Sequence, residues 1–248
     1  MMKGQPERTG FSKGIHGLAA FILRTGGEQT RLRRDFHRLL GRAGTAGTIL
    51  DVGAADGLMT LEYAKLLKVP EGGVFGVEVM DYYLERIAKG VKAQKLDIEK
   101  EPFPYREGTF DVVVCNQVLE HLKNIFLPLS EMERVLRPGG YLALGIPNLA
   151  GLHNRALLAF GFQPLCNAIS GPHVRCFTHK GFLELLRSNG NFTVEAVAGS
   201  SLYPLPWPLV DLGARFFPGL SAYTFYLLRK TGTNSGGWLR KSIGDTCL

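Results

Sequence analysis

Residues 48 to 57 read Thr-Ile-Leu-Asp-Val-Gly-Ala-Ala-Asp-Gly, and this stretch decides the fold of the chain. An apolar run ends in an acid and a glycine-rich turn, and a helical pattern of apolar residues begins at Leu58. A strand, a tight turn and a helix in this order form the first half of a Rossmann-like βαβ unit. Gly53 and Gly57 permit turn conformations and a close approach of a ligand. The turn also lies at a helix N-terminus, which favours a carboxylate or phosphate, although an ordinary strand-to-helix turn has the same pattern.

Strands and helices alternate along most of the remaining chain. The predicted strands are 48–52, 74–79, 94–98, 110–115, 141–146, 192–198 and 223–228. The predicted helices include 58–68 and 82–90, one that ends at the Pro-Gly-Gly turn of residues 138–140, and one that Thr178 caps. This alternation predicts an α/β fold with a doubly wound, mostly parallel sheet.

Three polar residues lie at the ends of other predicted strands. Glu78 lies 21 residues after Gly57, the spacing at which an acid accepts hydrogen bonds from ribose hydroxyls, although a solvent-exposed acid at a strand end is also consistent with the pattern. Asp97 lies at the C-terminal end of the next predicted strand, and Asn116 follows the one after it. Ligands of open α/β sheets bind at the carboxyl ends of the strands. The glycine-rich turn and these three residues therefore predict a single site.

Two segments interrupt this alternation, and both ends of the chain differ in composition from its centre. The predicted regions are a basic N-terminal helical extension over 1–46, a main domain over 47–230 and a flexible tail over 231–248. Within the extension, the apolar residues of 11–22 fall on one helical face, which suits a lid, a membrane-surface helix or a helix packed on the domain. The interrupting segments, 149–177 and 202–220, predict lids or substrate walls, and the apolar, proline-rich 202–220 also suits a membrane-contact patch or a dimer surface.

The net charge of +7 is concentrated at the two ends of the chain. Residues 1–50 contain nine Lys and Arg against three acids, residues 229–248 contain four against one, and residues 51–228 carry a net charge of −2. This distribution argues against a nucleic-acid-binding core. The four cysteines are scattered without zinc spacing, which indicates a reducing, cytoplasmic location, and a peripheral contact with a membrane stays open.

A series of motifs resembles the class I S-adenosylmethionine-dependent methyltransferases, specifically the type 11 methyltransferase domain. The motifs are Leu-Asp-Val-Gly-Ala-Ala-Asp-Gly at 50–57, Gly-Val-Glu at 76–78, Leu-Asp-Ile at 96–98, Phe-Asp-Val-Val-Val-Cys-Asn-Gln-Val-Leu-Glu-His-Leu at 110–122, Leu-Arg-Pro-Gly-Gly-Tyr-Leu at 136–142 and Gly-Pro-His-Val-Arg-Cys-Phe-Thr at 171–178. The resemblance covers about residues 45 to 230 and lies in the fixed order of the motifs.

The resemblance implies a Rossmann-like, seven-stranded, three-layer fold whose last strand, 223–228, lies antiparallel beside the fifth. It also implies S-adenosyl-L-methionine as the cofactor. By their positions in the motifs, Asp51, Gly53, Ala54, Ala55 and Gly57 would hold the methionine end, Glu78 the ribose hydroxyls, Val79 and Met80 the adenine ring, Asp97 the adenine amino group, Ile98 a ring nitrogen through its amide, and Asn116 would lie near the methionine moiety. Ala55 stands where the family has a glycine. We expect this replacement to tighten the local packing rather than to abolish cofactor binding.

Methyl transfer from a sulfonium is a direct displacement that depends on positioning and on exclusion of water, and it requires no metal. An oxygen or nitrogen acceptor can require a base, for which His121 and His173 are the candidates, while a structural role is open for each. The apolar segments at 152–162 and 202–220 favour a small, hydrophobic or amphipathic acceptor, and sugar-nucleotide or other metabolite acceptors stay open. The oligomeric state stays open.

Two other classes of protein compete with this interpretation. A nicotinamide-dependent oxidoreductase requires a Gly-x-Gly-x-x-Gly turn, which residues 53–57 do not supply, and Asp56 would place a negative charge near the pyrophosphate. A non-catalytic nucleotide- or S-adenosylmethionine-binding or scaffold protein would associate with a membrane or RNA through the basic N-terminus. It predicts that deletion of residues 1–46 abolishes this binding while cofactor affinity is negligible. Cofactor titration separates these classes.

Overall fold

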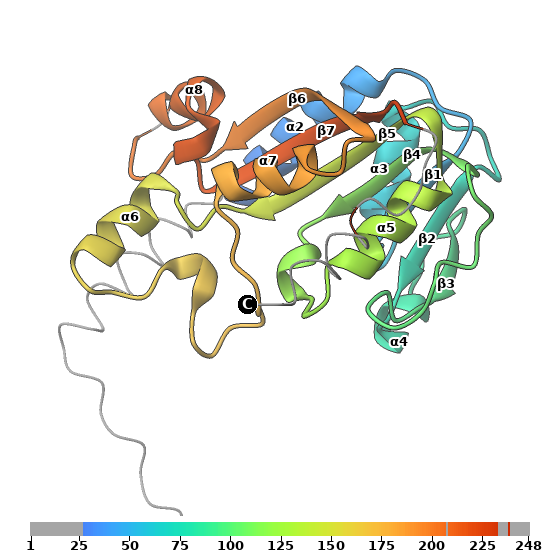
Figure 1. Cartoon of the computed structure of the whole chain (residues 1–248), viewed down its shortest axis with the longest axis horizontal. Coiled ribbons are helices and arrows are strands. Elements are labelled where there is room, and N and C mark those ends of the chain that lie inside the picture. The colour runs from blue at the N-terminus through green and yellow to red at the C-terminus, as the bar shows by residue number, and fades with distance from the viewer. Residues whose placement is uncertain (1–26, 207, 233–237, 239–248) are drawn as a thin grey trace, which may run out of the picture.

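The structure, a computed structural model, describes residues 27–206, 208–232 and 238. The helix predicted at 11–22 and most of the tail predicted at 231–248 lie outside these residues. The described chain forms three layers, with helices on both faces of a central sheet (Figure 1). None of the helices in this part of the chain has the length and apolar character of a membrane span.

The central sheet has seven strands in the order β3-β2-β1-β4-β5-β7-β6. The strands are β1 (Ile49–Val52), β2 (Val74–Glu78), β3 (Lys92–Lys95), β4 (Phe110–Asn116), β5 (Leu136–Pro147), β6 (Phe192–Ser200) and β7 (Tyr223–Lys230). Neighbouring strands are parallel except at β7, which is antiparallel to both β5 and β6. The predicted doubly wound sheet and its inserted antiparallel last strand are confirmed.

Alternating side chains of the buried strands supply two cores, one on each face of the sheet. The helices are α2 (Glu28–Leu40), α3 (Leu58–Leu66), α4 (Asp81–Leu84), α5 (Phe126–Val135), α6 (Leu152–Ala159), α7 (His179–Arg187) and α8 (Leu209–Phe216). On β4, Val113 packs in the cluster that contains residues of α5 and α7, while Val112 and Val114 pack in the cluster that contains residues of α2 and α3.

The helix predicted at 82–90 is wrong in extent, since α4 ends at Leu84. The chain turns beyond this point because the amide of Ala88 donates a hydrogen bond to the carbonyl of Asp56 at 2.8 Å. This contact holds the connection between α4 and β3 against the glycine-rich turn.

The predicted bounds of two strands also require correction. β3 covers 92–95 rather than 94–98, because its residues pair with Phe75–Glu78 of β2 and the chain leaves the sheet where the Leu96 amide donates to the Glu78 carbonyl. β5 begins at Leu136 rather than at 141, directly after α5. The Pro-Gly-Gly turn of 138–140 therefore lies within the irregular first part of a strand.

The two interrupting segments lie beyond the carboxyl ends of β5 and β6, where Figure 1 shows α6 and α8 at the same end of the molecule. The buried side chain of Asn148 joins them, because its Nδ2 donates to the carbonyls of Gly219 and Ser221 and its Oδ1 accepts from the amide of His179. The later part of the first segment returns to the sheet edge at Glu120, whose carbonyl accepts from the amides of residues 174 and 175.

Candidate functional site

A cavity of about 750 Å³ lies at the carboxyl ends of β1, β2 and β4, and we name it the strand-end cavity. Its volume falls in the range of small-molecule sites, which is roughly 300–1,000 Å³. Its lining residues are Gly53, Val77, Glu78, Val79, Met80, Tyr83, Leu96, Asp97, Ile98, Glu99, Gln117, Val118, His121, Leu122 and Pro172. The structure therefore brings six of the residues predicted to hold the cofactor to one cavity, together with His121.

The turn after β1 brings backbone to the wall of this cavity. Gly53 has a φ of 80°, and a Cβ there would lie 2.5 Å from Cγ2 of Val118, so only glycine fits. The amides of Gly53 and Ala54 both donate to the carbonyl of Val77, at 2.9 and 3.1 Å. These bonds hold the turn against the end of β2.

Ala55, where the resembling family has a glycine, adopts a left-handed conformation with a φ of 47°. This conformation costs a residue with a Cβ about 1–2 kcal/mol. The sequence predicts tighter packing at this position, and the structure adds a second effect, which is backbone strain. The Ala55 amide donates to Oε2 of Glu78 at 3.0 Å, so the strained residue makes a contact with the acid at the end of β2.

The Glu78 carboxylate is held by backbone amides on both of its oxygens. Oε1 accepts from Val79 and Met80 at 2.9 and 3.0 Å, and Oε2 accepts from Ala55. A carboxylate has about four acceptor positions, so the bonds leave capacity for about one further donor. These bonds hold the Glu78 carboxylate in a fixed orientation at the cavity. That orientation suits a residue that accepts a hydrogen bond from a ribose hydroxyl.

The cavity lining also combines an ionised acid with exposed apolar side chains. Lys100 donates to the Asp97 carboxylate at 2.6 Å and holds the pKa of that carboxyl below its usual value. Val79 and Met80 line the cavity although about half of each residue is exposed to solvent. A hydrogen-bond acceptor beside solvent-exposed apolar side chains suits the binding of a flat heterocycle with an amino group.

Five of the residues predicted to bind the cofactor are not among the lining residues, and these are Asp51, Ala54, Ala55, Gly57 and Asn116. Asp51 is buried under the turn, where it accepts from the Thr60 hydroxyl at 2.6 Å, and burial raises the pKa of its carboxyl to about 6. Nδ2 of Asn116 lies 3.3 Å from the hydroxyl of Tyr63. The two side chains therefore link α3 to β1 and β4.

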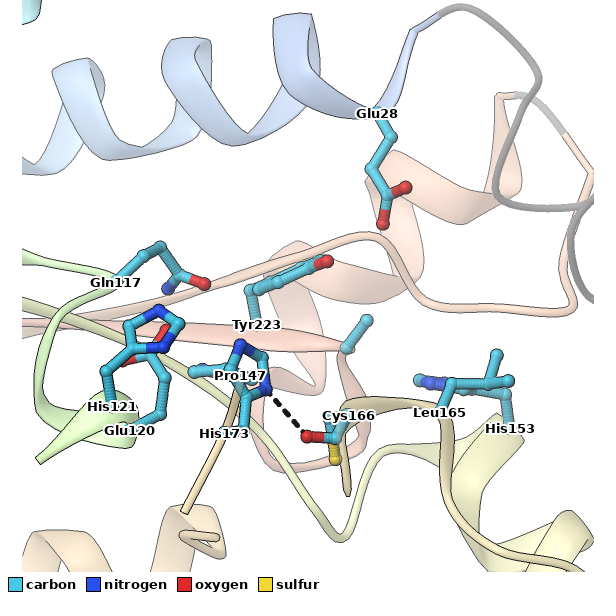
Figure 2. Close-up of a pocket in the computed structure, with 11 residues that line it drawn as sticks. Glu28, Gln117, Glu120, His121, Pro147, His153, Leu165, Cys166, His173 and Tyr223 are labelled. Atoms are coloured by element: carbon cyan, nitrogen blue, oxygen red, sulfur yellow. Dashed lines mark hydrogen bonds between the residues drawn. The ribbon is translucent and has the colours of Figure 1, made fainter. Parts of the chain in front are cut away.

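A second cavity of about 250 Å³, which we name the histidine cavity, adjoins the first. It is lined by Glu28, Gln117, Glu120, His121, Pro147, His153, Leu165, Cys166, His173, Ala222 and Tyr223 (Figure 2). Gln117 and His121 line both cavities. A group held in one cavity therefore meets a group held in the other beside these two side chains.

The structure brings the two candidate bases together. The rings of His121 and His173 lie with their centroids 4.8 Å apart, although 52 residues separate them. Nδ1 of His121 lies 3.3 Å from the Pro172 carbonyl oxygen, and Nδ1 of His173 lies 2.7 Å from the Cys166 carbonyl oxygen. Because a carbonyl can only accept, each neutral ring carries its proton on Nδ1 and presents an unprotonated Nε2.

Glu120 and Gln117 are functional candidates that the sequence interpretation missed. Glu120 is 1% exposed, and neither of its carboxylate oxygens has a hydrogen-bond partner among the described residues. Burial raises the pKa of this carboxyl to about 7. Gln117 has a φ of 58°, and its Nε2 is also buried with no partner in the part of the chain that the structure describes. The sequence signal available for Glu120 was an acid between two leucines, Leu119 and Leu122. No sequence signal marked Gln117.

The far part of the histidine cavity is neutral and partly apolar. Burial lowers the pKa of the His153 imidazole to about 4 and raises the pKa of the Cys166 thiol to about 11. Both groups are therefore uncharged at neutral pH, and Cys166 is not a reactive thiolate. Figure 2 shows His153 and Leu165 away from the paired histidines, with Cys166 between these groups in this view.

Comparisons with known proteins agree with this geometry. A model of the methyltransferase domain family matches residues 25–197. A crystal structure of an S-adenosylmethionine-dependent methyltransferase from Thermotoga maritima superposes with a TM-score of 0.59 at 17% identity, covering 90% of this chain and 98% of that one. At this identity the likeness is one of fold.

Two curated relatives match shorter stretches. An uncharacterized methyltransferase of Schizosaccharomyces pombe is 38% identical over 108 residues, which are 38% of this chain and 37% of that protein. The 27-O-demethylrifamycin SV methyltransferase of Amycolatopsis mediterranei is 31% identical over 117 residues, covering 42% and 41%. The matched stretch thus spans less than half of each relative's length.

Proposed function

The chain belongs to the methyltransferase domain family and is an S-adenosylmethionine-dependent methyltransferase. We propose that it methylates a hydroxyl group of a small, partly apolar acceptor. The acceptor binds in the histidine cavity and the cofactor in the strand-end cavity. The observation that carries this proposal is that Gln117 and His121 line both cavities. Methyl transfer requires such a meeting point, because donor and acceptor must be in line and close together.

The residues of the strand-end cavity fit the cofactor. The oriented carboxylate of Glu78 would accept from the ribose, the ionised Asp97 would accept from the adenine amino group, and the exposed Val79 and Met80 would cover the adenine ring. The backbone of Gly53 would lie against the methionine end. Bound there, S-adenosylmethionine supplies an electrophilic methyl group.

The residues at the meeting point act on the acceptor. A hydroxyl is a poor nucleophile until its proton is removed, and the unprotonated Nε2 atoms of His121 and His173 are suited to favour that loss. Backbone carbonyls lie beside both Nδ1 atoms and orient the two rings. His121, which is exposed and lines both cavities, is the nearer of the two to the cofactor's cavity.

The lining of the histidine cavity supports an acceptor that is apolar in part. Pro147, Leu165 and Ala222 present apolar surface, while the neutral His153 and the Tyr223 hydroxyl can orient polar groups. Apolar walls also exclude water, which would otherwise compete for the nucleophile's proton and position. The relative named 27-O-demethylrifamycin SV methyltransferase supports an oxygen as the methylated atom.

Calorimetric titration tests the cofactor, and transfer of a tritiated methyl group to a panel of hydroxylated quinols, polyketides and lipids tests the acceptor. We expect S-adenosylmethionine and S-adenosylhomocysteine to bind while NAD does not. Substitution His121→Ala should lower transfer about 100-fold or more, within the range of general-base catalysis, with cofactor affinity changed much less. Absence of heat with both sulfur nucleosides would contradict the assignment of this cavity.

A further inference from the structure

We propose that Glu120, His121 and His173 form a binding site for a divalent transition-metal ion, with Zn²⁺ as the best match. One carboxylate oxygen and one nitrogen from each ring lie within 4.8 Å of one another. Ligands around a tetrahedral ion with bonds of about 2.0–2.1 Å lie roughly 3.3 Å apart, so the ligand atoms must approach one another by at most about 1.5 Å. His121 is exposed and has the freedom to make that movement.

The buried carboxylate of Glu120 points independently to a cation. The residue is 1% exposed, and both carboxylate oxygens lack a partner within the described part of the chain, although its own backbone carbonyl accepts from the amides of Val174 and Arg175. Buried carboxylates in proteins are normally paired, hydrogen-bonded or bound to a metal, because an isolated buried charge is costly. Among the residues that the structure describes, no Lys or Arg lines the histidine cavity that Glu120 faces. A bound cation would supply the missing partner.

The two histidines have the hydrogen bonds that metal ligands need. A ligating imidazole generally donates its other N–H to a backbone carbonyl or carboxylate, which orients the ring and raises its basicity. His121 is placed in this way by Pro172 and His173 by Cys166. Two nitrogens and one oxygen suit Zn²⁺ better than Mg²⁺, which prefers oxygen ligands. Three protein ligands also leave a coordination position open.

The role of the ion rests on the proposed function. The open position would bind the acceptor oxygen and lower the pKa of its hydroxyl, so that the proton leaves to solvent. The oxygen then forms a bond to the methyl carbon as the bond from that carbon to sulfur breaks, with its electron pair retained on sulfur. His121 and His173 act here as ligands, and the ion performs the activation assigned to them above. The proposal reverses the sequence-based expectation that no metal is required.

Metal binding can be measured without an acceptor. The full chain, stripped with a chelator, is titrated with Co²⁺, and the visible d–d absorption of the ion reports its ligands. We expect the absorption to saturate and to have the form typical of Co²⁺ with fewer ligands than the aqueous ion. Addition of Zn²⁺ should abolish it by displacing Co²⁺. Glu120→Gln and His173→Gln should each weaken Co²⁺ binding about 100-fold or more. Loss of a residue that only hydrogen-bonds a metal ligand already costs about 10–100-fold, and loss of a ligand should cost at least as much. The matched control His153→Gln removes a histidine from the same cavity and should retain wild-type Co²⁺ affinity.

Calorimetric affinity for S-adenosylhomocysteine and the thermal midpoint show that each variant is folded. A wild-type protein that leaves Co²⁺ with its aqueous spectrum would overturn the proposal, as would equal binding by the wild type and both ligand variants. Methyl transfer unaffected by stripping would leave the proposed function standing and remove the ion from it. Tight Co²⁺ binding that depends on Glu120 and His173, without transfer to any acceptor, would support the metal site and contradict the proposed function.

Discussion

The Glu78 carboxylate accepts a hydrogen bond from the backbone amide of Ala55 at 3.0 Å, so the end of β2 and the glycine-rich turn are held together by one side chain. The same carboxylate accepts from Val79 and Met80. The acid that we assign to the ribose therefore also fixes the turn that we assign to the methionine end. A change at Glu78 acts on both parts of the cofactor's site.

Glu78→Ala should weaken S-adenosylmethionine binding by about 1.5–3 kcal/mol, the scale of a hydrogen bond to a charged group. Glu78→Gln should also weaken binding, because its amide nitrogen would face either the Ala55 amide or the amides of Val79 and Met80, donor against donor. Titration calorimetry measures both. Unchanged affinity in the alanine variant would show that the ribose does not lie at Glu78.

Ala55→Gly should stabilise the protein by about 0.5–1 kcal/mol in denaturant unfolding. A glycine adopts a φ of 47° without the penalty that the alanine Cβ imposes, and the entropy that glycine adds to the unfolded chain offsets part of this gain. Cofactor affinity should change little, since the amide that contacts Glu78 remains. A loss of stability would indicate that the methyl group of Ala55 makes packing contacts worth more than the strain.

The order of strands, turns and strand-end acids made the fold predictable, because each motif depends on residues that are close together in the sequence. Gly53 could be found because close backbone approach demands glycine, and Glu78 because its distance from the turn is set by one βαβ unit. The bounds of α4 and β3 were wrong because they depend on contacts between distant residues, such as the Ala88 amide with the Asp56 carbonyl.

The histidine cavity was only partly predictable for the same reason. His121 follows β4 directly, but His173 reaches it only because the chain returns from α6 and docks residues 174 and 175 on the carbonyl of Glu120. Spacing along the sequence contains no sign of that return. The burial of Glu120, which decides its chemistry, is likewise a property of the assembled fold.

Asp51→Asn should make stability less dependent on pH. A carboxyl whose pKa is higher in the folded protein stabilises the fold when protonated, and this contribution is complete below about pH 4 and is lost as the pH rises through about 6. The wild type should therefore lose on the order of 3 kcal/mol relative to Asp51→Asn between about pH 4 and pH 8. Asparagine can still accept from Thr60. Parallel stability curves for the two proteins would contradict the raised pKa.

Gln117→Ala should lower the rate of methyl transfer about tenfold or more while S-adenosylhomocysteine affinity changes little, because the side chain lies where the two cavities meet and positions the reacting groups. Gln117→Gly removes the same amide and also relieves a φ of 58°, so it should be more stable than Gln117→Ala and equally slow. Transfer assays and thermal unfolding separate the two effects. Wild-type rates in both variants would exclude Gln117 from the meeting point.

Phe36→Ala should destabilise the protein by about 3–5 kcal/mol, the usual cost of removing a buried phenylalanine ring. Phe36 on α2 is 1% exposed and packs against Tyr63 and Phe225, with ring centroids 5.4 and 5.3 Å apart. The control Arg38→Ala removes an exposed side chain of the same helix and should change stability by roughly 0.5 kcal/mol or less. Denaturant unfolding of both variants decides where the domain begins. If Phe36→Ala is as mild as the control, α2 belongs to a dispensable extension over 1–46; a large difference places α2 in the catalytic domain.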